Sequence, residues 1–323
     1  MRRFENILCV VNPEEAFRQV VEQAVALAEA NQAQLTVVWV APAQEWGRLA
    51  AEAPRSIDEL RAAYVSRRQK QLEEFLQPWS ESSCIRHAVL EGKLFLEVIR
   101  AVLRDHFDVV IKLAGSSGPV QRLFGSDDMH LLRKCPCPVW LLRPAENHGY
   151  PKRIMAALDL EVDGVDSASA ALNAEVLGLA GSLSVETMAE LHLVHAWDAP
   201  GELAVLTWSN NPVADTALLV ERERTLHQAG LDRLRDQLRQ SLGAEAYELI
   251  APTFHMVKGN ASAVIPETAR SLGADLVVMG TVARTGVPGL LIGNTAETIL
   301  EQLDCSVLAI KPPGFETPVT LQV

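Results

Sequence analysis

The sequence predicts an α/β protein built from two tandem copies of one doubly wound domain, each with a five-stranded parallel sheet. Three observations support this prediction. The chain has 323 residues, which is more than one ordinary domain. Short, almost continuously apolar runs alternate with stretches of helical length, as in a parallel sheet that helices cover on both faces. The same series of runs and stretches then occurs a second time.

The first strand of each half is an apolar run that stops at a polar residue. Residues 7–12 read ILCVVN, and residues 154–159 read IMAALD. Runs of this length and composition are typical of buried strands, and a final Asn or Asp is typical of a turn or a helix cap. Asn12 and Asp159 are therefore expected at the carboxyl ends of equivalent strands.

The later elements follow in one order in both halves: helix, strand, long charged helix, strand, helix, strand, a loop with a last helix, and strand. In the first half we expect helices at 16–30, 57–76 and 94–104. We expect the strands that follow the first one at 35–40, ending at 91–92, at 108–111 and at 138–144. In the second half we expect helices at 167–179, 216–242 and 262–272. We expect the corresponding strands at 190–195, ending at 258–259, at 275–278 and at 306–312. Right-handed crossovers between parallel strands then produce a doubly wound sheet.

A linker separates the two halves. Residues 144–151 contain two prolines and one glycine among polar residues, which is typical of a connecting segment. We therefore predict a first domain at residues 1–147 and a second domain at residues 148–323.

Composition limits the classes of partner. The net charge of −12 argues against a nucleic-acid partner, because an acidic chain repels a phosphate backbone. We expect no membrane span, because no apolar run approaches about 18 residues. The five cysteines are an odd number in a large chain and favour a reducing compartment over a disulfide framework. We therefore expect a cytoplasmic protein.

A ligand site is expected beyond the carboxyl ends of the strands in the second half. Three segments converge there in such a fold: the end of the first strand at Asp159, the glycine-containing stretch 280–286, and the helix start at 293–297. A helix N-terminus offers free N–H groups and a partial positive charge, which suit a phosphate. A glycine-rich turn with an ordinary helix cap is the alternative interpretation.

These segments also carry a family resemblance that covers essentially the whole chain. The pattern from Met279-Gly280 through Gly293-Asn294 to residues 307–310 resembles the C-terminal signature of universal stress proteins. The stretches 280–286, 293–297 and 130–136 are similar to the tandem, UspE-type members of this UspA superfamily. The resemblance implies a Rossmann-like fold of the adenine nucleotide alpha hydrolase type and a role in stress survival.

The resemblance implies ATP or AMP as a ligand of the second domain. ATP-binding members carry two glycines three positions apart and, after nine intervening residues, a third glycine followed by Ser or Thr. Here Gly280 and Gly293 keep that spacing, Ala283 replaces the second glycine, and Asn294 replaces Ser or Thr. The acidic residue of the family that contacts the nucleoside matches Asp159. The implied site residues are Asp159, Gly280, Ala283, Gly293, Asn294 and Thr295.

The first domain departs further from the nucleotide-binding pattern. Asn12 stands where the second half has Asp159, and Leu113 stands where it has Gly280. Only Gly125, followed by Ser126, survives at the start of the last helix. We interpret this half as degenerate for ATP.

The sequence shows no catalytic constellation, so we predict a protein that is not an enzyme, or at most a slow ATPase. Cys135 and Cys137 precede a core strand and lack the second ligand pair that zinc needs, so we interpret them as buried and expect no metal. His192 and His195 point to opposite faces of one strand, and His255 is isolated, so structural roles are favoured.

Two function hypotheses remain beside nucleotide binding. The long connection at residues 198–215 is rich in apolar side chains and is expected to fold over the other domain, a dimer partner or a hydrophobic ligand. Together with Ala283, it favours an amphipathic or hydrophobic small molecule in a modified pocket. A protein-interaction module without a small ligand is the third hypothesis. The resemblance further implies that the two domains pair through their fifth strands, with a homodimer as a further possibility.

Overall fold

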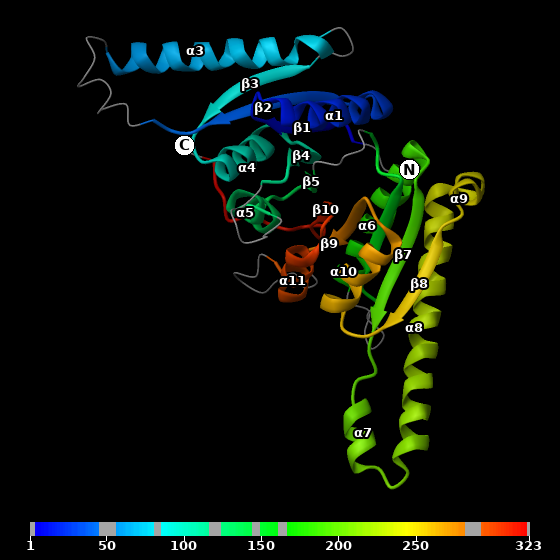
Figure 1. The fold of residues 1–323 in the computed structure, drawn as a ribbon. Helices are drawn as coiled ribbons and strands as arrows, with labels where there is room; N and C mark the ends of the chain where they lie inside the picture. The colour runs from blue at the N-terminus through cyan, green and yellow to red at the C-terminus, as the bar shows by residue number, and fades with distance from the viewer. Residues whose placement is uncertain are drawn as a thin grey trace. The chain divides into compact units, whose positions relative to one another are not determined.

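We analysed a computed structural model of the chain, which describes residues 4–44, 56–80, 85–115, 124–143, 149–160, 167–281 and 292–321. The chain forms two compact units (Figure 1). One unit contains the first half through Tyr150 together with the tail that begins at Glu316. The other unit runs from Pro151 to Phe315. Each unit is described by itself below.

The first unit is a parallel sheet with the strand order β3-β2-β1-β4-β5. Its strands are β1 (Asn6–Val11), β2 (Gln34–Ala41), β3 (Arg86–Glu91), β4 (Val109–Leu113) and β5 (Val139–Leu142). Its helices are η1 (Glu15–Phe17), α1 (Arg18–Asn31), α3 (Ile57–Leu76), η2 (Gln77–Trp79), α4 (Leu94–Asp105) and α5 (Ser126–Lys134). The central strands β1 and β4 are buried along almost their whole length, as expected for apolar runs covered on both faces.

The second unit repeats this arrangement with the order β8-β7-β6-β9-β10. Its strands are β6 (Arg153–Leu158), β7 (Glu190–Trp197), β8 (Thr253–Lys258), β9 (Leu276–Gly280) and β10 (Ser306–Ile310). Its helices are α6 (Ser167–Thr187), α7 (Glu202–Trp208), α8 (Pro212–Leu242), α9 (Ala244–Ile250), α10 (Ala261–Leu272) and α11 (Asn294–Gln302). The predicted tandem, doubly wound α/β fold is thus confirmed.

Helix caps explain where several helices begin and end. Ser56 and Glu59 form a capping box at the start of α3, with each side chain bonded to the backbone of the other. The Asn260 side chain accepts a hydrogen bond from the Ser262 N–H at the start of α10. Gly273 ends α10 in the left-handed conformation with φ +59°, which favours glycine.

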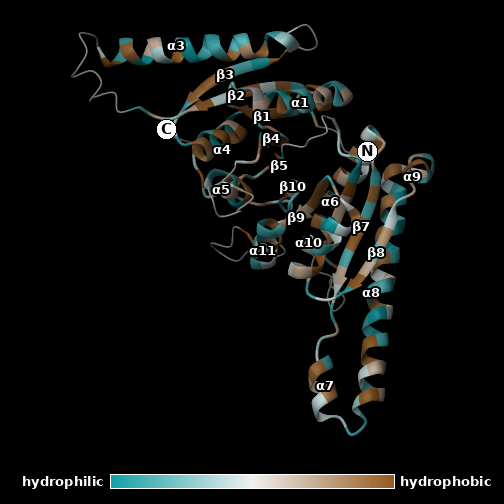
Figure 2. Cartoon of the chain, viewed as in Figure 1, coloured by the Kyte–Doolittle hydropathy of each residue, from teal (hydrophilic) through white to brown (hydrophobic). Residues whose placement is uncertain are grey.

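The connection expected as a loop at residues 198–215 is helical instead, so that prediction was wrong. It contains α7 and the first turn of α8, and the two helices pack together as an arm that extends past the end of the sheet (Figure 1). Leu203 and Leu206 are exposed on this arm, as are Trp208 and Val213. Figure 2 shows hydrophobic colours on α7 and the start of α8. The corresponding connection of the first half lies largely outside the described residues.

Helix α6 qualifies a second expectation. Residues 168–187 are long and apolar enough to cross a membrane by length and composition, although the sequence was expected to contain no such stretch. In the structure α6 packs against β6 and β9, and 61% of its apolar window is buried. Core helices of soluble proteins have the same properties, because a helix covered on several sides is apolar on several sides.

Candidate ligand site at the switch point of the second sheet

A cavity of about 350 Å³ lies in the second unit at the carboxyl ends of β6 and β9. The chain proceeds from β6 outward to β7 and β8, then returns to build β9 and β10 on the other side. The crossovers on the two sides diverge at this point, so the sheet opens between β6 and β9. We call this space the switch-point cavity.

Most side chains around the switch-point cavity are apolar. The larger apolar side chains are Leu158, Leu172, Val176, Ile265, Met279 and Ile299. The polar ones are Asp159, Ser169, Asn173, Thr281, Asn294 and Thr295. Among the described lining residues there is no Lys, Arg or His, and Asp159 is the single charged side chain. The lining suits a ligand that is largely apolar and carries a small polar end.

The structure brings together five of the six predicted site residues. Asp159, Gly280, Gly293, Asn294 and Thr295 all line the switch-point cavity. The sixth, the alanine at position 283, lies outside the described residues. Their assembly follows from topology, because the carboxyl ends of parallel strands and the N-termini of the next helices meet at one edge of the sheet.

Asp159 is held in place through its backbone by Asn173, which the sequence prediction missed. The Asn173 amide N–H donates to the Asp159 carbonyl at 2.6 Å, and the Asp159 backbone N–H donates to the Asn173 side-chain oxygen at 3.2 Å. This two-way bond fixes the end of β6 to α6. A polar residue on the sheet-facing side of an apolar helix was the available sequence signal.

The N-terminus of α11 opens into the switch-point cavity. Gly293 occupies the capping position and has no side chain to bond the first helical N–H groups. No other side chain in the described part of the chain caps this helix. The N–H groups of the first turn and the partial positive charge of the helix therefore face the cavity, as in anion sites at helix N-termini.

Packing against Leu172 favours a glycine at position 280, and the sequence prediction missed this reason. A Cβ atom at this position would lie 2.4 Å from Leu172 Cδ2, which is too close for any real contact. Leu172 from α6 therefore packs directly on the end of β9. By contrast, a Cβ at Gly293 would meet only the Thr281 carbonyl oxygen, at 3.8 Å. A side chain at position 280 would force Leu172 to move, whereas position 293 has room for a side chain.

The first unit contains an internal carboxylate at the equivalent place. Asp128, in the first turn of α5, is completely buried and accepts hydrogen bonds from the backbone N–H groups of Gly115 at 2.7 Å and Gly125 at 2.9 Å. Its other oxygen lies 2.8 Å from the Lys112 ammonium. This carboxylate therefore occupies the N–H groups of the loop residue Gly115 and of the capping residue Gly125.

The strand register shows which residues replace this ion pair in the second unit. Val109 pairs with Ile7, and Leu276 pairs with Ile154 at the equivalent place. Lys112 therefore corresponds to Met279. Counting from the capping glycines of α5 and α11 places Ala296 where the first unit has Asp128. An apolar pair that lines the switch-point cavity thus takes the place of a buried ion pair.

A pair of buried histidines lies next to the switch-point cavity. His195 Nδ1 lies 3.1 Å from the Leu158 carbonyl oxygen, and His195 Nε2 lies 2.9 Å from His227 Nδ1. Because a carbonyl only accepts, His195 Nδ1 carries its proton and donates it to Leu158. Neutral His195 then accepts at Nε2, and His227 donates from Nδ1.

Burial lowers the pKa of His195 from its ordinary value of 6.5 to about 4. The Leu158 carbonyl opposes this shift, and the neighbouring His227 adds to it. His195 is therefore neutral at pH 7 and serves as a structural link between β6, β7 and α8. A structural role was predicted for His195, whereas its partner His227 was missed.

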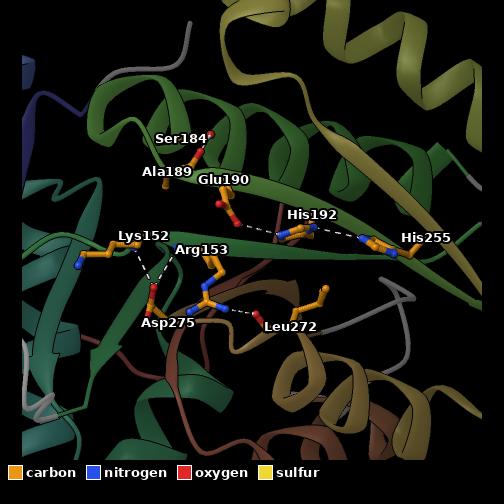
Figure 3. A network of polar contacts seen from close by, with 9 residues as sticks. All are labelled: Lys152, Arg153, Ser184, Ala189, Glu190, His192, His255, Leu272 and Asp275. Atoms are coloured by element: carbon orange, nitrogen blue, oxygen red, sulfur yellow. Dashed lines mark hydrogen bonds and ion pairs between the residues drawn. The ribbon is translucent and has the colours of Figure 1, made fainter.

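A second polar network lies at the opposite, amino-terminal edge of the same sheet (Figure 3). His192 Nδ1 lies 3.2 Å from His255 Nε2, and the Glu190 carboxylate lies 3.7 Å from His192 Nε2. Burial, and to a lesser extent His192, lowers the pKa of His255. His192 and His195 point to opposite faces of β7 as predicted, and each contacts a different histidine. Within the described residues no group of three or more acidic, His or Cys side chains is placed to hold a metal ion.

The same network contains a strand clamp that both units share. The Asp275 carboxylate accepts hydrogen bonds from the Lys152 and Arg153 backbone N–H groups, each at 2.9 Å (Figure 3). In the first unit the Asp108 carboxylate accepts from the backbone of Glu5 and Asn6 at 2.6 and 2.7 Å. Each aspartate precedes the fourth strand and holds the start of the first, which explains its presence in both halves.

The cysteines that precede the fifth strands, Cys135, Cys137 and Cys305, lie at or in the core. Cys135 and Cys305 are buried, and Cys137 is partly buried. The Sγ atoms of Cys135 and Cys137 lie 3.6 Å apart. A hydrogen bond with Cys135 and burial raise the pKa of the Cys137 thiol, so it stays protonated and weakly nucleophilic.

Comparisons with known proteins point to one family. The model of the Universal stress protein family matches residues 3–143 and 151–311. The chain is 26% identical to Universal stress protein E of Salmonella typhi over 99% of this chain and 98% of the relative. It is 30% identical to Universal stress protein E of Escherichia coli (strain K12) over 72% of this chain and 70% of the relative.

Solved structures have the same fold. A functionally unknown protein from Pseudomonas aeruginosa PAO1 is similar with a TM-score of 0.64 and 25% identity, covering 96% of this chain and 93% of that one. A universal stress protein from Archaeoglobus fulgidus DSM 4304 is similar with a TM-score of 0.59 and 15% identity, covering 95% and 98%. The second likeness concerns the fold alone.

Proposed function

The chain belongs to the universal stress protein family as a tandem member of the UspE type, and we propose that it acts in the stress response by binding one small ligand in the switch-point cavity. The observation that carries this proposal is the uncapped N-terminus of α11, which opens into a mostly apolar cavity beside Asp159. We further propose that the protein is cytoplasmic and acts by binding its ligand rather than by catalysing a reaction.

The first candidate ligand is an adenine nucleotide, AMP or ATP. The apolar wall offers a surface for the base, the Asp159 carboxylate can accept from ribose hydroxyls, and the N–H groups at the start of α11 can donate to a phosphate. A monophosphate suits the described lining better than a triphosphate, because no cationic side chain of that lining would neutralise the additional charge.

An amphipathic, non-nucleotide molecule is the second candidate. Leu172 covers the backbone at Gly280, where a nucleotide pressed against glycine would need space. Ala296 and Met279, in place of a buried ion pair, extend the apolar surface. A ligand with an aliphatic body and one anionic end would satisfy both this surface and the helix N-terminus.

Calorimetric titration of the full chain with AMP, ATP and dodecanoate tests the proposal. Replacing Gly293 with Leu should weaken binding of the preferred ligand at least about 100-fold. The new Cβ has only one atom within 4 Å, so the side chain fits without a clash and occupies space in the cavity that the ligand needs. Gly178→Leu is the matched control, since a Cβ there meets nothing within 4 Å and Gly178 does not line the cavity.

The outcomes separate the candidates. Tighter binding of AMP or ATP favours the nucleotide, and tighter binding of dodecanoate favours the amphipathic ligand. Equal affinity in the wild-type chain and in Gly293→Leu would contradict the proposed site. A chain that binds none of the three compounds, and carries no ligand in native mass spectrometry after purification, would leave the protein-interaction hypothesis.

A further inference from the structure

We propose that a second site, separate from the switch-point cavity, binds a small anionic aromatic compound in the groove between α8, the edge strand β8 and the end of the neighbouring strand β7. The groove has a volume of about 350 Å³. That volume is at the lower end of the range for small-ligand sites, about 300–1,000 Å³, and suits a compact molecule.

The spacing of the groove residues explains how they reach one surface. From α8 come Arg224, Gln228, Leu231 and Arg235, which follow at intervals of three or four residues and so share one helix face. From β8 come Phe254, Met256 and Lys258, which alternate along the strand and so share one sheet face. Trp197 adds a ring from the end of β7. Three regular elements therefore build the groove, rather than loops.

The charge of the groove is opposite to that of the chain. Arg224, Arg235 and Lys258 line it, and no carboxylate is among its described lining residues. The whole chain has a net charge of −12, so a patch with three cations stands out. Carboxylates outside the lining offset these three charges, so an anion binds in the groove by displacing them.

Aromatic rings lie directly beside these cations. The Arg235 guanidinium lies 4.7 Å from the centre of the Phe254 ring, and the Lys258 ammonium lies 6.0 Å from the centre of the Trp197 ring. A planar ligand can stack on the guanidinium or contact the phenyl ring while its anionic group pairs with a cation. The groove thus favours a compound that has a ring and a negative charge on the same molecule.

Carboxylates outside the lining currently pair with each cation. The Lys258 ammonium lies 2.7 Å from the Glu202 carboxylate, and Arg235 Nη1 lies 2.7 Å from Asp232. Arg224 Nη1 lies 3.6 Å from Glu221. All six side chains are about one third exposed or more, and ion pairs exposed to water contribute little to stability. An incoming anion can therefore displace these partners, and Glu202 acts as an internal competitor for Lys258.

Titration of the full chain with naphthalene-1-sulfonate tests the proposal, with neutral naphthalene-1-methanol as the comparison compound. Arg235→Met and Lys258→Met should each weaken sulfonate binding at least about 10-fold, because each keeps an unbranched side chain and removes one charge. Glu202→Gln should strengthen binding about 2- to 5-fold, because it frees Lys258 from its competitor. A merely structural role of Glu202 would not raise affinity.

The matched control lies one helical turn further along α8. Arg239 lies 5.9 Å from the Tyr247 ring centre and pairs with Glu248, but it does not line the groove. Arg239→Met should therefore leave sulfonate affinity unchanged, and so should Gly293→Leu, which fills the other cavity. Equal binding of the neutral comparison compound, unchanged affinity in both charge-removing variants, or loss of binding in Gly293→Leu would overturn the proposal.

Discussion

His195 illustrates how one buried side chain can be assigned a protonation state from its contacts. Its Nδ1 faces a carbonyl that can only accept a hydrogen bond, so Nδ1 is the donor. Its Nε2 therefore accepts a hydrogen bond from Nδ1 of His227. The ring is 1% exposed, and charging it would cost free energy because no carboxylate is its hydrogen-bond partner. The pair therefore stabilises the fold in its neutral form.

This state predicts a pH dependence of stability. The folded-state pKa of His195 is about 4, against an ordinary value of 6.5. Between these values the unfolded chain binds more protons, so the stabilisation is fully present above about pH 6.5 and is lost as the pH falls towards 4. At about 1.4 kcal/mol per pKa unit, the loss amounts to at most about 3 kcal/mol.

Urea unfolding of the wild-type chain and of His195→Gln between pH 7 and pH 4.5 measures this effect. Glutamine retains a donor for the Leu158 carbonyl but does not titrate. The difference in free energy of unfolding between the two proteins should therefore shrink as the pH falls. A difference that stays constant over this range would contradict the assignment of His195.

At the scale of single elements, α5 and α11 show one helix start used in two ways. Both helices begin after a glycine without a capping side chain. In α5 a buried aspartate from the first turn folds back onto the loop, whereas α11 has Ala296 at that position and leaves its N–H groups facing a cavity. The same position in the first turn thus holds a buried carboxylate in α5 and a methyl group that lines the cavity in α11.

The Lys112–Asp128 pair supplies a prediction at this scale. Asp128→Ala should lower the free energy of unfolding by about 3–5 kcal/mol, because it leaves a buried ammonium unpaired and removes the acceptor for two backbone N–H groups. The double variant Lys112→Met with Asp128→Ala, which copies Met279 and Ala296, should cost less than the single change. Denaturant unfolding of both single variants and the double variant completes the cycle, and additive costs would show that the two side chains are not coupled.

At the scale of the whole molecule, the two units repeat one strand order but differ at the carboxyl ends of their strands. The first has the buried Lys112–Asp128 ion pair there, and the second has a cavity. Pairing of the two domains through their fifth strands, and formation of a homodimer, stay predictions, as does the role of the apolar α7–α8 arm.

Ligand binding to the full chain should therefore slow hydrogen exchange in the second unit and leave exchange in the first unit unchanged. At a free AMP concentration 100 times its dissociation constant, mass action stabilises the binding unit by about 2.7 kcal/mol. Amides of β6, β9 and α11 that exchange by unfolding of that unit should then slow about 100-fold, while those of β1, β4 and α5 stay unchanged. Equal slowing in both units would mean that the first unit also binds the ligand, or that the units unfold together.

Much of the fold was predictable because local composition specifies it. Apolar runs such as 7–12 and 154–159 have no stable place except the centre of a covered sheet, and the repetition of the series located both halves. Prediction failed at 198–215, where an apolar stretch was interpreted as a loop. Helix α7 packs mainly on the first part of α8, whose buried residues begin only at His227, so the signal of a helix facing a sheet was missing there.

The sequence by itself determined the family, the tandem fold and which five described residues surround the switch-point cavity, because strand order alone brings them to one edge of the sheet. Only the tertiary structure decided what those residues can do. Leu172 packs on Gly280, Asn173 holds the backbone of Asp159, and Asp128 binds the backbone of Gly115. The two residues of each contact are 13 or more positions apart in the chain. Such contacts depend on how helices pack on the sheet, and no local pattern of apolar and polar residues specifies them.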